Sequence, residues 1–178
     1  GSEMCSSDLY GDPTLTTHMM GPLISERQRQ RVLAYIQKGI DEGATLVTGG
    51  GIPTHLPKGY FVEPTLLANV DPDSTVAQEE IFGPVLVVIA HDGDDDAVAI
   101  ANNSIYGLSG SVFSGSPERA EAVARRIRTG TIGINGGVWF GHDVPFGGYK
   151  QSGVGREMGP EGFEEYTEIK ILASVNMG

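Results

Sequence analysis

Apolar and polar residues first follow a helical period between residues 25 and 43. Ser25 opens this stretch and Gln28 stands three residues later, which is the spacing of a capping box at a helix start. Gly43 then supplies a residue suited to a helix end. One face of the predicted helix carries the apolar residues Val32, Leu33, Ile36 and Ile40. The pattern therefore predicts an amphipathic helix that packs one side on a core.

Three stretches that follow have the composition of β-strands. Residues 44–48 form a short apolar run, and residues 60–68 form a longer one that Pro64 interrupts. Because proline has no N–H to donate to a strand ladder, we expect the second run at a sheet edge or at a bulge. Residues 84–91 are apolar with little interruption, which predicts a strand buried on both faces.

The second half of the chain alternates helices and strands. Residues 94–103 carry acidic side chains in their first turn, and Pro117 stands at the first position of a helix expected to end near residue 128. The remaining elements are strands over 109–114 and 131–135, a glycine-rich loop over 136–159, a helix over 160–166 and a strand over 169–175. The alternation predicts an α/β fold with a mainly parallel sheet and flanking helices.

Composition and charge narrow the class of protein. The 178 residues include 39% hydrophobic and 20% charged residues, which is ordinary for a globular domain. A net charge of −11 opposes binding to nucleic acid or to an anionic membrane. No apolar run has the length of a membrane span. The single cysteine allows no disulfide within the chain, so we expect a reducing, cytoplasmic setting.

The first residues differ from the rest in character. Gly1-Ser2 is typical of the remnant of a removed purification tag, and we expect residues 1–10 to be this remnant and a disordered leader. Residues 11–178 contain no linker or internal repeat, so we expect them to form one domain.

Motifs for metals, nucleophiles and phosphates are weak. The four histidines and Cys5 share no metal-ligand spacing, so no metal site is expected, and Cys5 is interpreted as an incidental surface thiol. Residues 153–159 contain three glycines, but their spacing departs from the dinucleotide fingerprint and no buried strand directly precedes them. We interpret this segment as a flexible connection into the last helix.

Two loops contain residues suited to ligand binding. Glu79 and Glu80 precede Phe82 and a Gly-Pro turn, so a carboxylate could accept bonds from sugar hydroxyls while the aromatic contacts a flat ring. An exposed acidic turn is the simpler interpretation, and both stay open. The second loop groups side chains that either line an apolar pocket or cover the edge of a core: Trp139, Phe140, His142 and Phe146.

Six stretches taken together resemble the aldehyde dehydrogenase superfamily. They occur in that family's order and near its spacing, and they extend over most of the chain from Gly11 onward. One of them, Glu79-Glu80-Ile81-Phe82-Gly83-Pro84-Val85, favours the aldehyde-oxidising branch of the superfamily. The full set covers residues 20–25, 59–65, 78–85, 101–109, 130–135 and 145–153.

The resemblance implies a role for individual residues. Glu80 resembles the glutamate that holds the hydroxyls of the nicotinamide ribose, and Phe82 resembles the aromatic beside the nicotinamide of NAD or NADP. Residues 169–175 resemble a strand used in subunit assembly, which implies a homo-oligomer. Phe140 and Phe146 resemble positions that line the aldehyde tunnel, with Trp139 and His142 near them.

The same resemblance implies that the chain is a partial catalytic domain. The family's nucleophilic cysteine, its general-base glutamate and its dinucleotide-binding segment have no counterpart here, so no catalytic residue is expected in this chain. We therefore expect part of an aldehyde-oxidising NAD(P)-dependent enzyme that is inactive by itself. The alternative is a non-catalytic truncated homologue that acts as an assembly or binding module, and the mass of the native protein separates the two.

Overall fold

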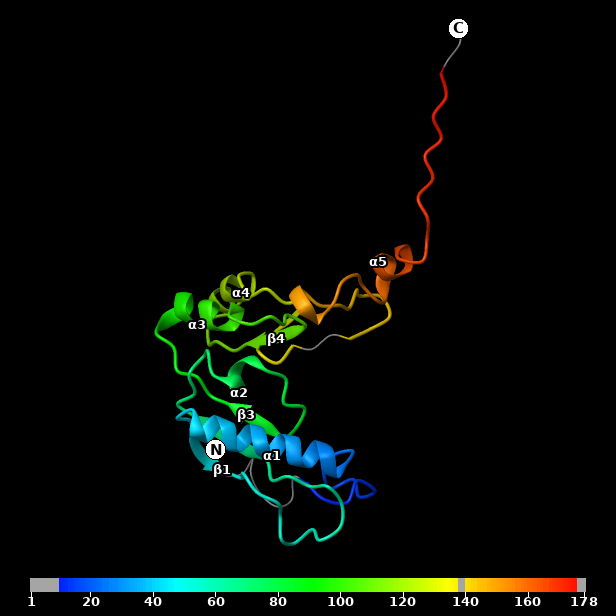
Figure 1. The fold of residues 1–178 in the computed structure, drawn as a ribbon. Helices are drawn as coiled ribbons and strands as arrows, with labels where there is room; N and C mark the ends of the chain where they lie inside the picture. Colours follow the sequence, from blue (N-terminus) through cyan, green and yellow to red (C-terminus); the bar gives the residue numbers. More distant parts are fainter. Residues whose placement is uncertain (1–9, 138–139, 176–178) are drawn as a thin grey trace. The chain divides into compact units, whose positions relative to one another are not determined.

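The computed structural model describes residues 10–137 and 140–175, and it divides the chain into two compact units (Figure 1). The first unit is Gly1–His91 and the second is Asp92–Gly178. The prediction of one partial catalytic domain over residues 11–178 stays a prediction. Tyr10, the last residue of the expected leader, is only 7% exposed and forms a bridge with Met20.

Helix α1 (Glu26–Asp41) confirms the first predicted element. The hydroxyl of Ser25 accepts a hydrogen bond from the N–H of Gln28 at 3.2 Å, so Ser25 caps the helix as predicted. Gly43 follows the helix at φ 101°, a backbone conformation that glycine adopts without strain. Only half of the predicted capping box is present among the described residues: the Ser25 N–H makes no bond to the Gln28 side chain, whose amide instead donates to residues distant in sequence.

The first unit holds a three-stranded sheet of β1 (Thr45–Thr48), β2 (Thr65–Ala68) and β3 (Val85–Val87), in the order β1-β2-β3. β1 pairs with β2 antiparallel, with an irregular register at β1, and β2 pairs with β3 parallel. Of the two alternatives predicted for the run over 60–68, a sheet edge or a bulge, the edge was wrong, while the register of the β1–β2 pairing does shift, between Leu46 and Thr48 of β1. β2 is the central strand, and it starts after Pro64, so the missing N–H of the proline falls outside the ladder.

The core of the first unit lies between α1 and one face of this sheet. Val32 and Ile36 of α1 and Leu67 of β2 are each at most 2% exposed. The prediction that the strand over 84–91 is buried on both faces was wrong for this chain. Leu86 is 62% exposed and Val88 is 46% exposed, because their side chains point away from α1 and no described element of the first unit covers them.

A short helix that the sequence pattern did not predict, α2 (Thr75–Gln78), begins beside the end of α1. The Glu42 carboxylate accepts bonds from the backbone N–H of Thr75 at 2.9 Å and from its hydroxyl at 2.7 Å. Both hydrogen bonds lower the pKa of the Glu42 carboxyl, and the bond from the Thr75 hydroxyl has the larger effect. The contact fixes the start of α2 and therefore the position at which the segment between α2 and β3 begins.

The second unit confirms the predicted alternation of helices and strands. Strands β4 (Ser109–Val112) and β5 (Thr131–Ile134) pair in parallel, and α4 (Pro117–Ala124) connects them and packs on both. α4 ends before the predicted residue 128, because the N–H groups of Arg126 and Ile127 bond three residues back in a tightened turn. The other elements are α3 (Gly93–Asn102), the 3-10 helix η2 (Lys150–Ser152) and α5 (Gly159–Glu164).

The strand predicted over residues 169–175 does not form within this chain. The segment continues from α5 without a strand partner, and Ile169, Ile171 and Leu172 are each at least 86% exposed (red in Figure 1). A strand needs a neighbouring strand for its backbone groups, and none of the described residues supplies one. In the described part of the chain, no helix is long and apolar enough to cross a membrane.

The α/β class predicted from the sequence is confirmed. Two of the three strand pairs are parallel, although the strands form two sheets and not one. Helices flank each sheet, and each sheet belongs to one unit.

Replacing Leu67 with alanine tests the core of the first unit. Leu67 is fully buried, so we expect Leu67→Ala to lower the free energy of unfolding by about 2–5 kcal/mol. Leu86→Ala is the matched control in the neighbouring strand, where the exposed side chain predicts a change below about 1 kcal/mol. Urea denaturation of the chain measures both, and equal effects would contradict this description of the core.

Candidate functional site

The first group of predicted site residues lies in the turn between α2 and β3. Ile81 is 9% exposed and belongs to the core of the first unit. Its neighbours Glu80 and Phe82 are both exposed, and the ring of Phe82 is largely uncovered, at 72%. The buried Ile81 side chain therefore anchors the turn, and the Glu80 carboxylate and the Phe82 ring on either side of it face outward.

The backbone of this turn lies directly against α1. A β-carbon added to Gly83 would stand 2.5 Å from Cγ2 of Val32, so only glycine allows this close approach. Phe82, just before it, adopts φ 60°, in the left-handed region. Such a conformation costs a residue other than glycine about 1–2 kcal/mol, so the surrounding contacts must hold it.

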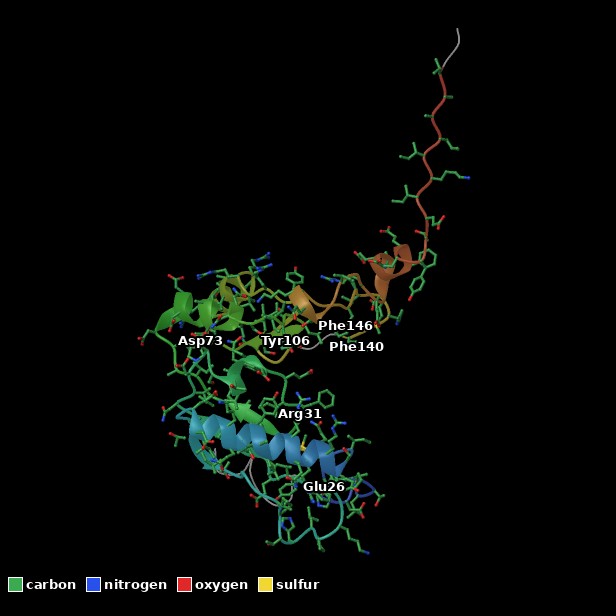
Figure 2. All side chains as sticks on the ribbon, viewed as in Figure 1. Glu26, Arg31, Asp73, Tyr106, Phe140 and Phe146 are labelled. Carbon is green, nitrogen blue, oxygen red and sulfur yellow. The ribbon has the colours of Figure 1, made fainter. Side chains whose placement is uncertain are left out.

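Side chains of α1 supply those contacts. The guanidinium of Arg31 donates from Nη2 to the carbonyl oxygen of Glu80 at 2.9 Å. The amide of Gln28 donates to the carbonyl oxygens of Ile81 at 3.2 Å and of Phe82 at 3.0 Å. Figure 2 labels Arg31 on α1.

The sequence pattern did not indicate these α1 residues. It assigned Gln28 to a local cap and gave Arg31 no role, because a polar residue on a helix surface carries no sign of a partner some fifty positions away in the chain. The hydroxyl of Tyr35 likewise donates to the carboxylate of Glu79 at 2.6 Å, which the apolar pattern could not indicate.

The second group of predicted site residues lies in the glycine-rich loop of the second unit. The rings of Phe140 and Phe146 meet edge to face, with centroids 5.2 Å apart (Figure 2). Phe140 is 65% exposed and Phe146 is half-buried. The side chain of His142 is exposed. Trp139, the fourth predicted residue of this group, lies outside the described residues, as does Cys5.

Backbone pairing holds Phe146 in place. Its N–H donates to the carbonyl of Glu157 at 2.8 Å, and the N–H of Glu157 donates back at 2.7 Å. The carbonyl of His142 accepts from the N–H of Gly159, the first residue of α5, at 3.0 Å. The loop therefore folds back on itself, and Phe140 and Phe146 lie in the folded-back part.

Lys150 ties the same loop to the end of α3. Its ammonium donates to the carbonyl oxygens of Asn102 and Ser104, both at 2.9 Å. On the strand side, a β-carbon on Gly130 would stand 1.6 Å from the carbonyl oxygen of Gly147, so the loop lies in direct backbone contact with the start of β5. These two contacts fix the base of the loop.

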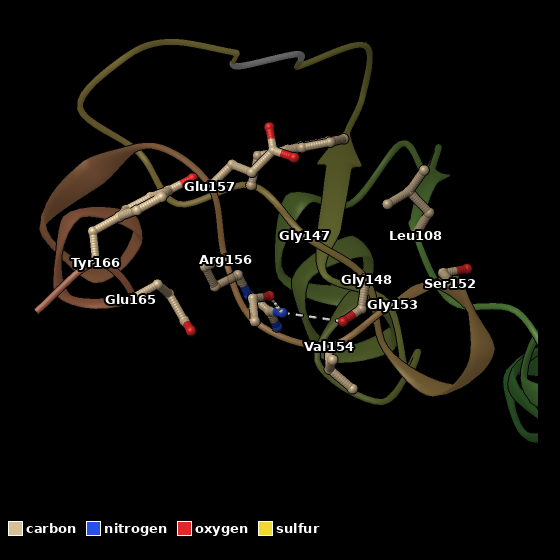
Figure 3. A pocket seen from close by; sticks show the side chains of 12 residues that line it. Leu108, Gly147, Gly148, Ser152, Gly153, Val154, Arg156, Glu157, Glu165 and Tyr166 are labelled. Carbon is tan, nitrogen blue, oxygen red and sulfur yellow. Dashed lines mark hydrogen bonds between the residues drawn. The ribbon is translucent and has the colours of Figure 1, made fainter. Parts of the chain in front are cut away.

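A pocket of about 260 Å³ lies beside Phe146 (Figure 3). Arg156 spans its wall, donating from Nη1 to the carbonyl oxygens of Gly148 at 3.1 Å and Gly155 at 2.7 Å. Leu108, Glu165 and Tyr166 add to the lining. Of these residues, only Phe146 was predicted from the sequence. Residues 153–159 lead into α5, which starts at Gly159, as expected for a connection into the last helix.

The two groups of predicted residues belong to different units, and each is assembled within its own. Glu80 and Phe82 share the turn before β3, and Phe140, His142 and Phe146 share the loop after β5. In the described part of the chain, no group of three or more His, Cys, Asp or Glu side chains is arranged to hold a metal ion.

Comparison with known proteins relates this arrangement to one family. The model of the aldehyde dehydrogenase family matches residues 5–172. Betaine aldehyde dehydrogenase of Rhizobium leguminosarum bv. trifolii is 47% identical over 171 residues, which is 96% of this chain and 35% of that protein. A 3-succinoylsemialdehyde-pyridine dehydrogenase of a Pseudomonas species is 48% identical over 94% of this chain and 35% of its own length.

Solved structures show the same likeness in three dimensions. An aldehyde dehydrogenase of Mycobacterium tuberculosis, complexed with NAD+, has a TM-score of 0.89 and 51% identity over 94% of this chain and 34% of its own. A variant of aldehyde dehydrogenase C of Pseudomonas syringae, complexed with NAD+ and octanal, has a TM-score of 0.85 and 48% identity, and 91% of this chain is covered. The chain spans about a third of the length of the relatives it matches. Because the family match extends over nearly all of its residues and the folds agree, the chain belongs to the aldehyde dehydrogenase family.

Proposed function

We propose that this chain is part of an NAD(P)-dependent aldehyde dehydrogenase that oxidises an aldehyde to a carboxylic acid. Its share of the site is one wall of the nicotinamide pocket and part of the aldehyde tunnel. The observation that carries the proposal is the turn before β3, which presents Glu80 and Phe82 outward from the buried Ile81.

The residues of this turn suit a nicotinamide nucleoside. A bound NAD(P)+ would supply the acceptor for a hydride. The Glu80 carboxylate has no hydrogen-bond partner among the described residues, so its oxygens are available to the hydroxyls of a ribose. The ring of Phe82 is held outward by a left-handed backbone and offers a flat apolar surface to a planar heterocycle.

The aromatic pair of the second unit suits the aldehyde side of the site. Phe140 and Phe146 pack edge to face at the turn of a loop whose base is fixed by Lys150. Loop aromatics on a rigid support commonly line substrate pockets. We assign Phe140, Phe146, Trp139 and His142 to the wall of the aldehyde tunnel, and we assign no catalytic residue to this chain.

The assembly and location of the protein are also proposals. The exposed segment 169–175 has apolar side chains and backbone groups that pair with no strand among the described residues, which supports pairing with a strand of another subunit in a homo-oligomer. A net charge of −11 and the single cysteine support a cytoplasmic protein that binds neither nucleic acid nor membrane.

Assaying the isolated chain tests the division of the active site. Since the proposed share includes neither nucleophile nor general base, we expect no NAD(P)H formation when the chain is mixed with an aldehyde and NAD(P)+. The absorbance of NAD(P)H measures this, with a complete homologous enzyme as the positive control. Turnover by the isolated chain would show that it contains its own nucleophile.

Substituting Glu80 tests the ribose contact in the full-length protein. Glu80→Gln keeps the size of the side chain and removes its charge, and a hydrogen bond to a charged group contributes about 1.5–3 kcal/mol. We expect KM for NAD(P)+ to rise by roughly 10- to 100-fold. Glu121→Gln, an exposed change on α4, is the matched control and should leave KM unchanged. An unaltered KM in Glu80→Gln would remove this residue from the site.

Substituting Phe146 tests the aldehyde tunnel. We expect Phe146→Ala to raise KM for the aldehyde by roughly five- to tenfold through lost aromatic contact, with little effect on KM for NAD(P)+. Phe113→Ala is the control, since Phe113 is 73% exposed and stands outside this loop. Steady-state kinetics with each substrate varied in turn separates the two constants, and a change confined to NAD(P)+ would contradict the assignment.

A further inference from the structure

We infer that Gln28 and Arg31 of α1 are positioning residues for the cofactor-binding turn, acting through the carbonyl oxygens of Glu80, Ile81 and Phe82. The inference rests on the proposed function, because it gives the role of these bonds in a site that binds a nicotinamide nucleotide. Neither side chain is assigned to contact the cofactor or the reacting atoms.

The first support is the number of carbonyl groups that these two side chains satisfy. Glu80, Ile81 and Phe82 are consecutive, and the carbonyl oxygen of each accepts a bond from Gln28 or Arg31. Among the described residues, no backbone N–H donates to any of the three. The turn is outside every helix and strand, so its backbone depends on side-chain donors for its hydrogen bonds.

The second support is the geometry of the donors. Gln28 and Arg31 are three positions apart, so they project from neighbouring turns on the same side of α1. Val32, adjacent to Arg31, is the residue that Gly83 closely approaches. The same helix side therefore supplies both the packing surface and the donors for one turn.

The third support is that Arg31 is itself held in place. Its guanidinium lies 5.3 Å from the centroid of the Tyr35 ring, and the hydroxyl of Tyr35 donates to the carboxylate of Glu79 at 2.6 Å. The contact with Tyr35 thus helps to orient the Arg31 guanidinium toward the carbonyl oxygen of Glu80. This leaves Glu79 engaged with the helix, whereas Glu80 next to it faces outward.

These bonds oppose a specific rearrangement. Phe82 is held at φ 60°, and a residue other than glycine released from its contacts would move toward a negative φ. That rotation would turn the Phe82 ring and displace the Glu80 carboxylate two residues away. Loss of either donor should therefore weaken cofactor binding while the core around Ile81 remains packed.

The test uses the full-length protein, with Gln28→Leu and Arg31→Met as the disrupting variants. We expect each to raise both Kd and KM for NAD(P)+ by roughly tenfold, since each removes one or two hydrogen bonds to the turn. KM for the aldehyde should stay within about twofold of the unsubstituted protein, because the aldehyde-side residues belong to another loop. Titration of intrinsic fluorescence with NAD(P)+ gives Kd, and steady-state kinetics gives the KM values.

Two matched controls and one rescue variant accompany these changes. Gln30→Leu alters the same residue type on α1, where the amide of Gln30 bonds no described residue other than the nearby Glu26. Arg27→Met removes an exposed arginine of the same helix. Both controls should leave Kd for NAD(P)+ unchanged. Arg31→Lys keeps a charged donor, so it should restore Kd to within about threefold of the unsubstituted protein.

The outcomes separate a positioning role from a structural one. A lower unfolding midpoint with unchanged Kd in Gln28→Leu and Arg31→Met would overturn the inference and leave the proposed function standing. Failure of the unsubstituted protein to bind NAD(P)+ would overturn the proposed function and the inference with it. If Gln28→Leu does not fold, Gln28→Glu takes its place, because it keeps the side-chain size and removes the amide donor.

Discussion

The packing of α1 against strands β2 and β3 is the contact on which the first unit depends. It buries Val32, Ile36 and Leu67, which form the tightest part of the core. The same helix then reaches past the core to the turn before β3, where its polar residues satisfy the backbone. Because packing and hydrogen bonding come from one helix, the position of the proposed cofactor turn follows directly from the core.

The second unit also contains an irregular segment that is held in place, but by other contacts than those of the first unit. Its loop after β5 is fixed by the close backbone approach at Gly130 and by the two bonds that Lys150 donates. In both units a long polar side chain donates to backbone carbonyl oxygens: in the first unit the carbonyls belong to the turn, and in the second the donor Lys150 belongs to the loop and the carbonyls are those of Asn102 and Ser104. A loop fixed in this way can present side chains with little loss of order on ligand binding.

Apolar surface remains uncovered on both units. Leu86 and Val88 face away from the core of the first unit, and the segment over 169–175 extends from α5 with its apolar residues exposed. The relatives are about three times longer than this chain, and such surfaces support the proposal that further protein covers them. Because Leu86 and Val88 are exposed in this chain, the strand predicted over 84–91 is buried on one face and not on both.

The sequence by itself determined the features that depend on local chemistry. The period of apolar residues gave α1, Ser25 gave its cap, Pro117 gave the start of α4, and the six family stretches pointed to Glu80 and Phe82. Tertiary structure alone decided which strand is central, whether residues 169–175 form a strand, and what holds the proposed cofactor turn. These depend on partners distant in the chain, such as Gln28 with Phe82, and a residue's identity does not reveal its distant partner.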